Sequence, residues 1–165
     1  MYKTLVNLLL MSVTYPLMAL PEDSQAVIHV QAGWAELSQQ THLGTYKGGI
    51  AIDQGSTHIR ATSASTQGNA SNQLVKAMIK GDPHNQAHYW ALPAQDKPIV
   101  HAYADTIVYY PLTQDIELIG HARVEQGKHS FTAAVINYNI KTQHVGTKPM
   151  AGEQTTFIIQ PDKTS

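Results

Sequence analysis

Apolar and polar residues alternate along most of this chain. The segment 26–31, Ala-Val-Ile-His-Val-Gln, is the first example, and similar stretches follow it almost to the end of the sequence. A repeat of two residues is typical of β-strands that bury one face. No segment sustains apolar residues at positions i, i+3, i+4 and i+7, which would indicate an amphipathic helix. The pattern therefore predicts a chain built from β-strands.

Polar turns separate the predicted strands every eight residues or so, which is typical of all-β sandwiches and barrels. Gln54-Gly55-Ser56 and Gln126-Gly127-Lys128 have the composition of hairpin turns, and Gly48-Gly49 indicates a bulge or tight bend. Loops are expected at 66–72, 93–98 and 147–152. The alternation predicts strands at residues 26–31, 34–38, 41–47, 49–53, 57–63, 74–79, 88–92, 99–103, 106–110, 116–119, 122–125, 129–135, 137–142 and 155–160.

The pattern also repeats at a spacing of 72 residues. The stretch 48–55 (Gly-Gly-Ile-Ala-Ile-Asp-Gln-Gly) aligns with the stretch 120–127 (Gly-His-Ala-Arg-Val-Glu-Gln-Gly). Outside these stretches most aligned pairs are apolar on both sides and fall on alternate residues. A duplicated strand pattern favours an architecture that extends by repetition.

The repeat defines two matching sets of inward-facing positions. Two sheets with these inner faces would enclose either a closed hydrophobic core or an open apolar slot. The chain has only two Phe and two Trp, which is thin filling for sheets about 10 Å apart and mildly favours a slot. Both interpretations stay open. The positions are Leu37, Tyr46, Ile50, Ile52 and Ile59 in the first copy and Tyr109, Leu118, Ala122, Val124 and Phe131 in the second.

The N-terminal residues have the layout of a secretory signal peptide. Lys3 gives a short positive region, an apolar run covers 5–13, and Leu17-Met-Ala19 fits a cleavage site. The predicted signal peptide covers residues 1–19, with Ala26 as a second cleavage position, and residues 20–165 form a single domain. An uncleaved membrane anchor is the alternative, but the apolar run is shorter than the roughly 20 residues that span a bilayer.

Composition narrows the class of function. Removing Lys3 from the 11 basic residues leaves 10 against 12 acidic ones, so there is no positive surplus for binding nucleic acid. The chain has no cysteine, which excludes thiol-based redox chemistry. Export would place the domain in the periplasm or outside the cell.

Candidate chemistry is weak. The nine histidines are scattered, and a metal site needs three or four converging ligands. Only His101 and His121 are candidates for a pair across strands. Ser, His and Asp occur without a nucleophile signature such as Gly-x-Ser-x-Gly. We therefore predict no catalytic residues, no metal site and no cofactor.

The order and spacing of the motifs resemble the OstA-like (LptA) family of periplasmic lipopolysaccharide-transport proteins. The resemblance covers residues 28–161, and Gly33 departs from it, because the first copy is expected to carry Asp there. The motifs that carry it are Ile28-His-Val30, the stretch 48–55, Ala104-Asp105, Leu118-Ile-Gly120, Val124-Glu-Gln-Gly127 and the closing segment 155–161.

The resemblance implies a twisted antiparallel β-jellyroll, an all-β fold in which two facing sheets enclose an apolar slot for lipopolysaccharide acyl chains. The implied function is a non-enzymatic bridge that carries lipopolysaccharide from the inner to the outer membrane. Copies would stack end to end through the edges at 28–30 and 155–159, between an inner-membrane LptC-like jellyroll and an outer-membrane LptD-like jellyroll. The residues implied to contact lipid are Ile28, Val30, Leu37, Ile50, Ile52, Ile59, Tyr89, Tyr109, Leu118, Val124, Phe131 and Tyr138.

Two other functions stay open at this point. One is the membrane-anchored LptC-like jellyroll of the same pathway, which would retain residues 1–19. The other is a secreted carbohydrate-binding or metal-dependent β-sandwich protein that uses the histidines.

Overall fold

The computed structural model describes residues 26–142 and 144–161 of the 165-residue chain. The predicted signal peptide at 1–19 lies outside the described residues. Within them the chain forms eleven strands and no helix, as the alternation predicts. The strands are β1 (His29–Ser38), β2 (Leu43–Gln54), β3 (Thr57–Gly68), β4 (Leu74–Lys80), β5 (Ala87–Ala91), β6 (Val100–Ala104), β7 (Thr106–Tyr110), β8 (Asp115–Gln126), β9 (His129–Asn139), β10 (His144–Lys148) and β11 (Thr156–Ile158).

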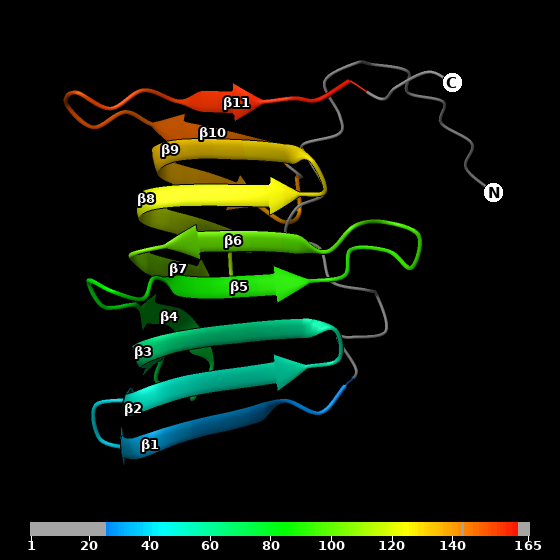
Figure 1. Ribbon diagram of the computed structural model, residues 1–165. Helices are drawn as coiled ribbons and strands as arrows, with labels where there is room; N and C mark the ends of the chain where they lie inside the picture. The colour runs from blue at the N-terminus through cyan, green and yellow to red at the C-terminus, as the bar shows by residue number, and fades with distance from the viewer. Residues whose placement is uncertain (1–25, 143, 162–165) are drawn as a thin grey trace.

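The strands are stacked in one antiparallel series from β1 at one end to β10 and β11 at the other (Figure 1). In the middle of the stack the series divides into two layers. β5 pairs with β6 in the front layer, and β4 pairs with β7 in the rear layer. The long strands β3, β8 and β9 each give one half to either layer, because each pairs with a front strand and with a rear strand. The result is a jellyroll with two facing sheets.

The 72-residue repeat is present in the strand pairing. Ile52 lies opposite Ile59 where β2 pairs with β3. At the equivalent positions of the second copy, Val124 lies opposite Phe131 where β8 pairs with β9. The first copy's β1 corresponds to β6 and β7 together, and both of these pair with β8 as β1 pairs with β2. The sequence repeat is therefore a repeat of structure.

Each copy bends at a bulge made of two residues with left-handed backbone. In β2 these are Gly48 and Gly49, with φ of 80° and 85°, and in β8 they are Gly120 and His121, with φ of 80° and 47°. This conformation costs a non-glycine residue about 1 kcal/mol. The His121 imidazole donates a hydrogen bond of 2.7 Å to the Asp105 carboxylate, which fixes the side chain and raises the pKa of His121. The bulge predicted at Gly48-Gly49 is confirmed.

The departure at Gly33 has a steric reason. A Cβ atom added to Gly33 would lie 2.8 Å from the carbonyl oxygen of Gly48, because β1 and β2 approach each other closely at the bend. The equivalent residue of the second copy, Asp105, lies instead in the break between β6 and β7, where its side chain packs against Gly120 and accepts a hydrogen bond from His121. Glycine in the first copy therefore keeps β1 continuous through the bend.

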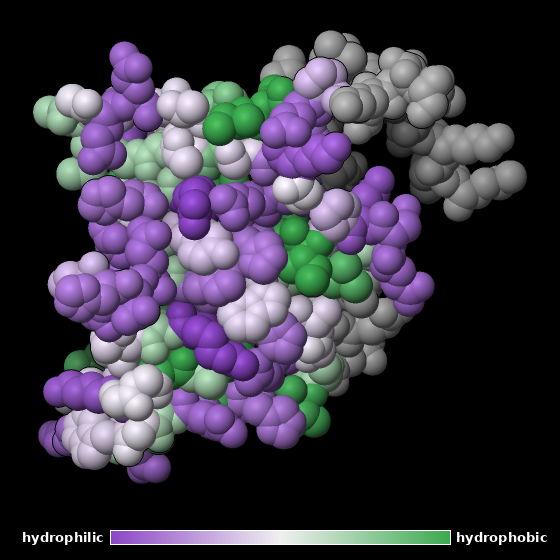
Figure 2. Space-filling view, in the orientation of Figure 1, coloured by the Kyte–Doolittle hydropathy of each residue, from purple (hydrophilic) through white to green (hydrophobic). Residues whose placement is uncertain are grey.

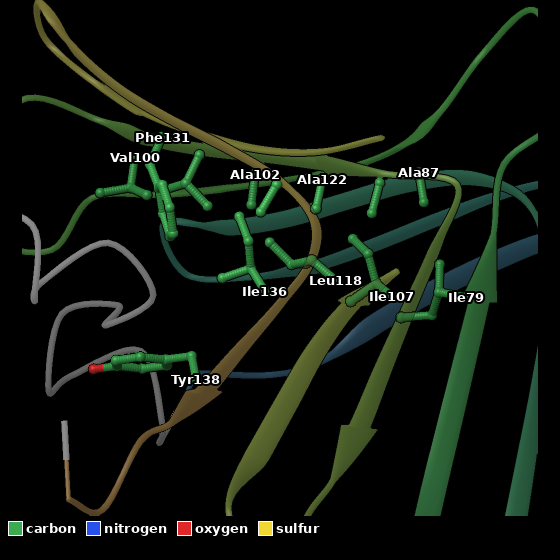
Figure 3. Packing of buried hydrophobic residues seen from close by; sticks show 13 residues of the cluster. Ile79, Ala87, Val100, Ala102, Ile107, Leu118, Ala122, Phe131, Ile136 and Tyr138 are labelled. Carbon is green, nitrogen blue, oxygen red and sulfur yellow. The ribbon is translucent and has the colours of Figure 1, made fainter. Parts of the chain in front are cut away.

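The hydrophobic core lies between the two layers, and side chains of unequal size meet there (Figure 3). The front layer contributes alanines, such as Ala87, Ala102 and Ala122, which are at most 1% exposed. The rear layer contributes larger residues, Ile79, Ile107, Leu118 and Ile136. Small side chains opposite large ones fill the interior closely, as native cores require.

The predicted strand boundaries are wrong where a strand continues through a bend. β1, β2, β8 and β9 are each continuous, whereas the alternation predicts two segments for each of them. A bulge in one strand interrupts the alternation of that strand or of the strand opposite, although the ladder of hydrogen bonds resumes beyond it. β10 lies partly in a predicted loop, because Gly146 and flanking polar residues hide its period of two.

Candidate functional site

A ladder of apolar residues crosses the inner face of the front layer from one end of the stack to the other. Each member lies directly opposite the next on the neighbouring strand. Directly opposed residues have Cβ atoms about 5 Å apart, so the side chains form a continuous surface. We call this set the front ladder; its members are Val30, Ile52, Ile59, Tyr89, Ala102, Val124, Phe131 and Phe157.

The rear layer presents a corresponding row. Tyr138 is a core residue, and Ile116 and Val145 pack against the core, which places this row on the inner face. Burial raises the pKa of both Tyr109 and Tyr138, because removal from water disfavours the charged phenolate. We call this set the rear ladder; its members are Leu37, Gly44, Thr66, Ala77, Tyr109, Ile116, Tyr138 and Val145.

Exposure varies along the front ladder. The end residues Val30 and Phe157 are each 54% exposed, whereas Ala102 is fully buried. Leu37, at the β1 end of the rear ladder, is 70% exposed. The apolar inner surface is therefore covered in the middle of the stack and reaches solvent at both ends.

The structure brings the twelve sequence-predicted lipid residues to this interior and its β1 end. Nine of them belong to the two ladders, and Leu118 and Ile50 are buried nearer the bend. Ile28, which is 58% exposed, precedes β1. Lipid contact at these positions stays a prediction. Sequence reasoning missed Ala102, Ile116, Val145 and Phe157, although Ala102 lies 72 positions after Val30 and was marked by the repeat.

The outer face of the front layer is polar, and Figure 2 shows it mostly hydrophilic. Its centre is a stack of rings, in which His88 lies between Trp90 and Tyr103 at centroid distances of 4.6 and 4.2 Å. The guanidinium groups of Arg60 and Arg123 lie over Trp90 and Tyr103 at 5.2 and 4.6 Å. This arrangement stabilises the pairing of β3, β5, β6 and β8 from outside.

Two of the histidines, His88 and His101, contact each other, whereas His58 and His121 each contact an aspartate. A hydrogen bond of 3.0 Å joins His88 Nε2 to His101 Nδ1, so His101 pairs with His88 and not with His121. Among residues 26–142 and 144–161, no group of three or more His, Asp or Glu side chains is placed to hold a metal ion. The histidines therefore give no support to a metal-dependent function.

His88 makes stability sensitive to acid. Burial, together with the nearby His101, Arg123 and Arg60, lowers the pKa of His88 from 6.5 to about 4. The unfolded chain takes up a proton near pH 6.5, whereas the folded chain takes it up only near pH 4, so stability falls as pH drops through this range. The unfolding midpoint in urea is expected to fall less between pH 7 and 4.5 in His88→Gln than in the wild type. His84→Gln, on an exposed turn, is the control, and equal acid sensitivity in all three proteins would contradict the assignment.

Both ends of the stack carry strand edges that have no neighbour among the described residues. β1 pairs only with β2, while β10 and β11 pair only with β9. An open edge presents unpaired backbone N–H and C=O groups that can accept a further strand.

The described part of the chain holds no helix of the length and apolar character needed to cross a bilayer.

Comparison with known proteins agrees with this geometry. The family model described as "LptA/(LptD N-terminal domain) LPS transport protein" matches residues 29–144. The lipopolysaccharide export system protein LptH of Pseudomonas aeruginosa is 31% identical over 153 residues, which cover 88% of this chain and 86% of LptH. LptA of Escherichia coli K12 is 24% identical over 155 residues, 93% of this chain and 82% of LptA. The crystal structure of P. aeruginosa LptH, the LptA homologous periplasmic component of the lipopolysaccharide transport device, is similar to this structure with a TM-score of 0.73 and 28% identity. The match covers 86% of this chain and all of that one.

Proposed function

The chain belongs to the LptA/LptD N-terminal family of lipopolysaccharide transport proteins, and from this premise we propose that it is a periplasmic bridge component carrying lipopolysaccharide between the two membranes. We propose further that it has no catalytic activity of its own. The lipid would be bound and passed on without a bond being made or broken.

The front ladder is the observation that carries this proposal. It runs across eight strands of the front layer, which at about 4.8 Å spacing give an apolar track of roughly 34 Å. Each acyl CH₂ group removed from water contributes about 0.8 kcal/mol. A track of this length can therefore shield acyl chains over the whole width of the domain.

The proposed path of the acyl chains lies between the front ladder and the rear ladder, on the side of the interior away from the bends at Gly48-Gly49 and Gly120-His121. Near the bend, alanines of the front layer pack against Ile107 and Leu118 of the rear layer. Farther out, Tyr138 of the rear ladder is well separated from Phe131 of the front ladder (Figure 3). We propose that acyl chains lie between the two ladders and that the rows near the bend serve as core.

The two open edges are the proposed docking sites for neighbours. In this proposal β1 lies at one end of a bridge segment and β10 with β11 at the other, and each edge accepts a strand from the next jellyroll. The neighbours would be further copies of this chain, an inner-membrane LptC-like jellyroll and an outer-membrane LptD-like jellyroll. Backbone hydrogen bonds across an added strand supply the affinity in such contacts.

Photo-crosslinking tests the proposed path with two matched tyrosines. Tyr89 belongs to the front ladder, while Tyr103 on the adjacent strand β6 stacks on the outer face. A benzophenone amino acid at Tyr89 is expected to give a lipopolysaccharide adduct on irradiation of cells, and the same probe at Tyr103 is not. Adducts of equal yield at the two positions, or only at Tyr103, would overturn the proposal.

A further inference from the structure

We propose that a second copy of this chain docks its β1 on β10 and β11 in the register that the chain already uses between its own two halves. The docking puts Val145 opposite Leu37 of the second copy and Phe157 opposite Val30 of the second copy. The inference rests on the proposed end-to-end association and adds to it the alignment of the strands. It follows from three pairings within the chain.

The first pairing is the internal junction between the two copies of the repeat. β4 and β5 close the first copy, while β7 and β6 open the second. In the rear layer, Ala77 of β4 lies opposite Tyr109 of β7. In the front layer, Tyr89 of β5 lies opposite Ala102 of β6. This junction shows the register in which the last strands of one repeat pair with the first strands of the next repeat.

The second pairing shows that the C-terminal edge is equivalent to the β4–β5 edge. In the rear layer, Ala77 pairs with Thr66 of β3, and Val145 pairs with Tyr138, the residue 72 positions after Thr66. Val145 of β10 therefore occupies the place of Ala77, which lies 68 positions before it.

The front layer gives the same offset independently. Tyr89 pairs with Ile59 of β3, and Phe157 pairs with Phe131, the residue 72 positions after Ile59. Phe157 of β11 therefore occupies the place of Tyr89, again 68 positions before it. Because both layers give one offset, the C-terminal edge as a whole repeats the edge of the internal junction.

The third pairing makes the β1 edge equivalent to the edge of β6 and β7. Val30 pairs with Ile52 as Ala102 pairs with Val124, at a spacing of 72 positions. Leu37 has the same relation to Tyr109 in the rear layer. The proposed contact between copies follows when β10 and β11 take the places of β4 and β5, and β1 of the second copy takes the places of β7 and β6.

The proposed register pairs apolar residues that are otherwise exposed. Leu37 is 70% exposed in the single chain, and Val30 and Phe157 are 54% exposed. Two residues farther along the same antiparallel pairing, Ile159 lies opposite Ile28 of the second copy. These residues are 61% and 58% exposed in the single chain. A slip of one residue would turn each of these side chains to the opposite face. A slip of two residues along β10 would put Leu37 opposite the polar residue Thr147.

The two edges also match in length and in the position of their breaks. β10 has five residues and β11 has three. The register of β1 shifts after Ala32, opposite the Gly48-Gly49 bulge of β2, and this shift divides β1 into a short front segment and a longer rear segment of five residues, Trp34–Ser38. The segment between β10 and β11 then faces Gly33 of the second copy, as the link between β4 and β5 faces Asp105, the residue equivalent to Gly33, in the internal junction. A second copy of this chain is therefore the occupant that the edge fits best.

Disulfide trapping tests the register, because the chain has no cysteine. Glu36 and Gly146 lie opposite each other in the proposed contact, as Val108 and Met78 do in the internal junction. Gly146 has room for a side chain, since the nearest atom to an added Cβ is 3.7 Å away. Glu36→Cys protein is mixed with Gly146→Cys protein and oxidised with copper phenanthroline. Opposed cysteines meet the disulfide requirement of Cβ atoms about 4 Å apart, whereas a slip of two residues places them 7–8 Å apart.

The matched control is Ser38→Cys, two residues along the same face of β1. The Glu36–Gly146 pair is expected to form the mixed disulfide about tenfold faster than the Ser38–Gly146 pair. Analytical ultracentrifugation measures whether the copies associate. If they associate but the two cysteine pairs form disulfides at equal rates, or the pair with Ser38→Cys is faster, the register is overturned and the bridge function is left intact. If the copies do not associate even at millimolar protein concentration, both the register and self-association are overturned. The proposed lipid transport is tested separately, by the crosslinking at Tyr89 described above.

Discussion

Replacing Leu118 by alanine is expected to lower the free energy of unfolding by about 3 kcal/mol. Leu118 is 1% exposed and lies between Ile107 and Ile136 on the inner face of the rear layer. Its truncation removes buried apolar surface and leaves a cavity that the two flanking strands, held by their hydrogen bonds, cannot close. Urea unfolding followed by circular dichroism measures the loss.

Leu112→Ala is the matched control for this truncation. Leu112 lies in the turn between β7 and β8 and is 64% exposed. Its removal is expected to change stability by less than about 0.5 kcal/mol. If both variants unfold at the wild-type midpoint, the interior near Leu118 is not the closely packed core described above.

Replacing Ile52 by aspartate is expected to reduce the affinity for lipopolysaccharide at least about tenfold. Ile52 is a half-buried member of the front ladder between Val30 and Ile59. A carboxylate there would have to lose water when an acyl chain covers it, and uncompensated burial of a charge costs several kcal/mol. Displacement of a fluorescent acyl probe from the purified protein measures the affinity.

Ala51→Asp provides the control, because Ala51 neighbours Ile52 on the same strand and faces the opposite side of the sheet. This variant adds the same charge outside the proposed path and is expected to bind like the wild type. Urea unfolding of both variants separates a loss of binding from a loss of fold. Equal affinities in the two folded variants would argue against the front ladder as the lipid path.

Much of the fold could be predicted from the sequence because one register is used twice. The alternation in 48–55 and its copy in 120–127 identified the bulges, both hairpins and the inward positions of β2, β3, β8 and β9. These features depend on local sequence, since a glycine pair or a hairpin turn is encoded in adjacent residues.

The parts that could not be predicted depend on distant residues. Phe157 corresponds to Tyr89 at an offset of 68, so a search for the 72-residue spacing does not find it. The offset differs by four because the second hairpin is four residues shorter: Thr66 pairs with Ala77, 11 positions on, whereas the equivalent Tyr138 pairs with Val145, 7 positions on. Ala102 is fully buried, and only its spacing of 72 positions from Val30 marks it, because an alanine alone gives little sign of which face it occupies. Pairing between His88 and His101 also depends on the register of β5 on β6, which no local pattern specifies.

The two ends of the stack differ from each other, and this has a consequence for how an assembly of copies would stop growing. A contact between unlike edges leaves one edge of each kind free after every addition, so it does not close on itself as a twofold dimer does. Each step would have nearly the same equilibrium constant as the last. Chain length in solution would then follow protein concentration, with a distribution of sizes and no preferred number. A defined length in the cell would require terminators, namely partners that carry only one of the two edges.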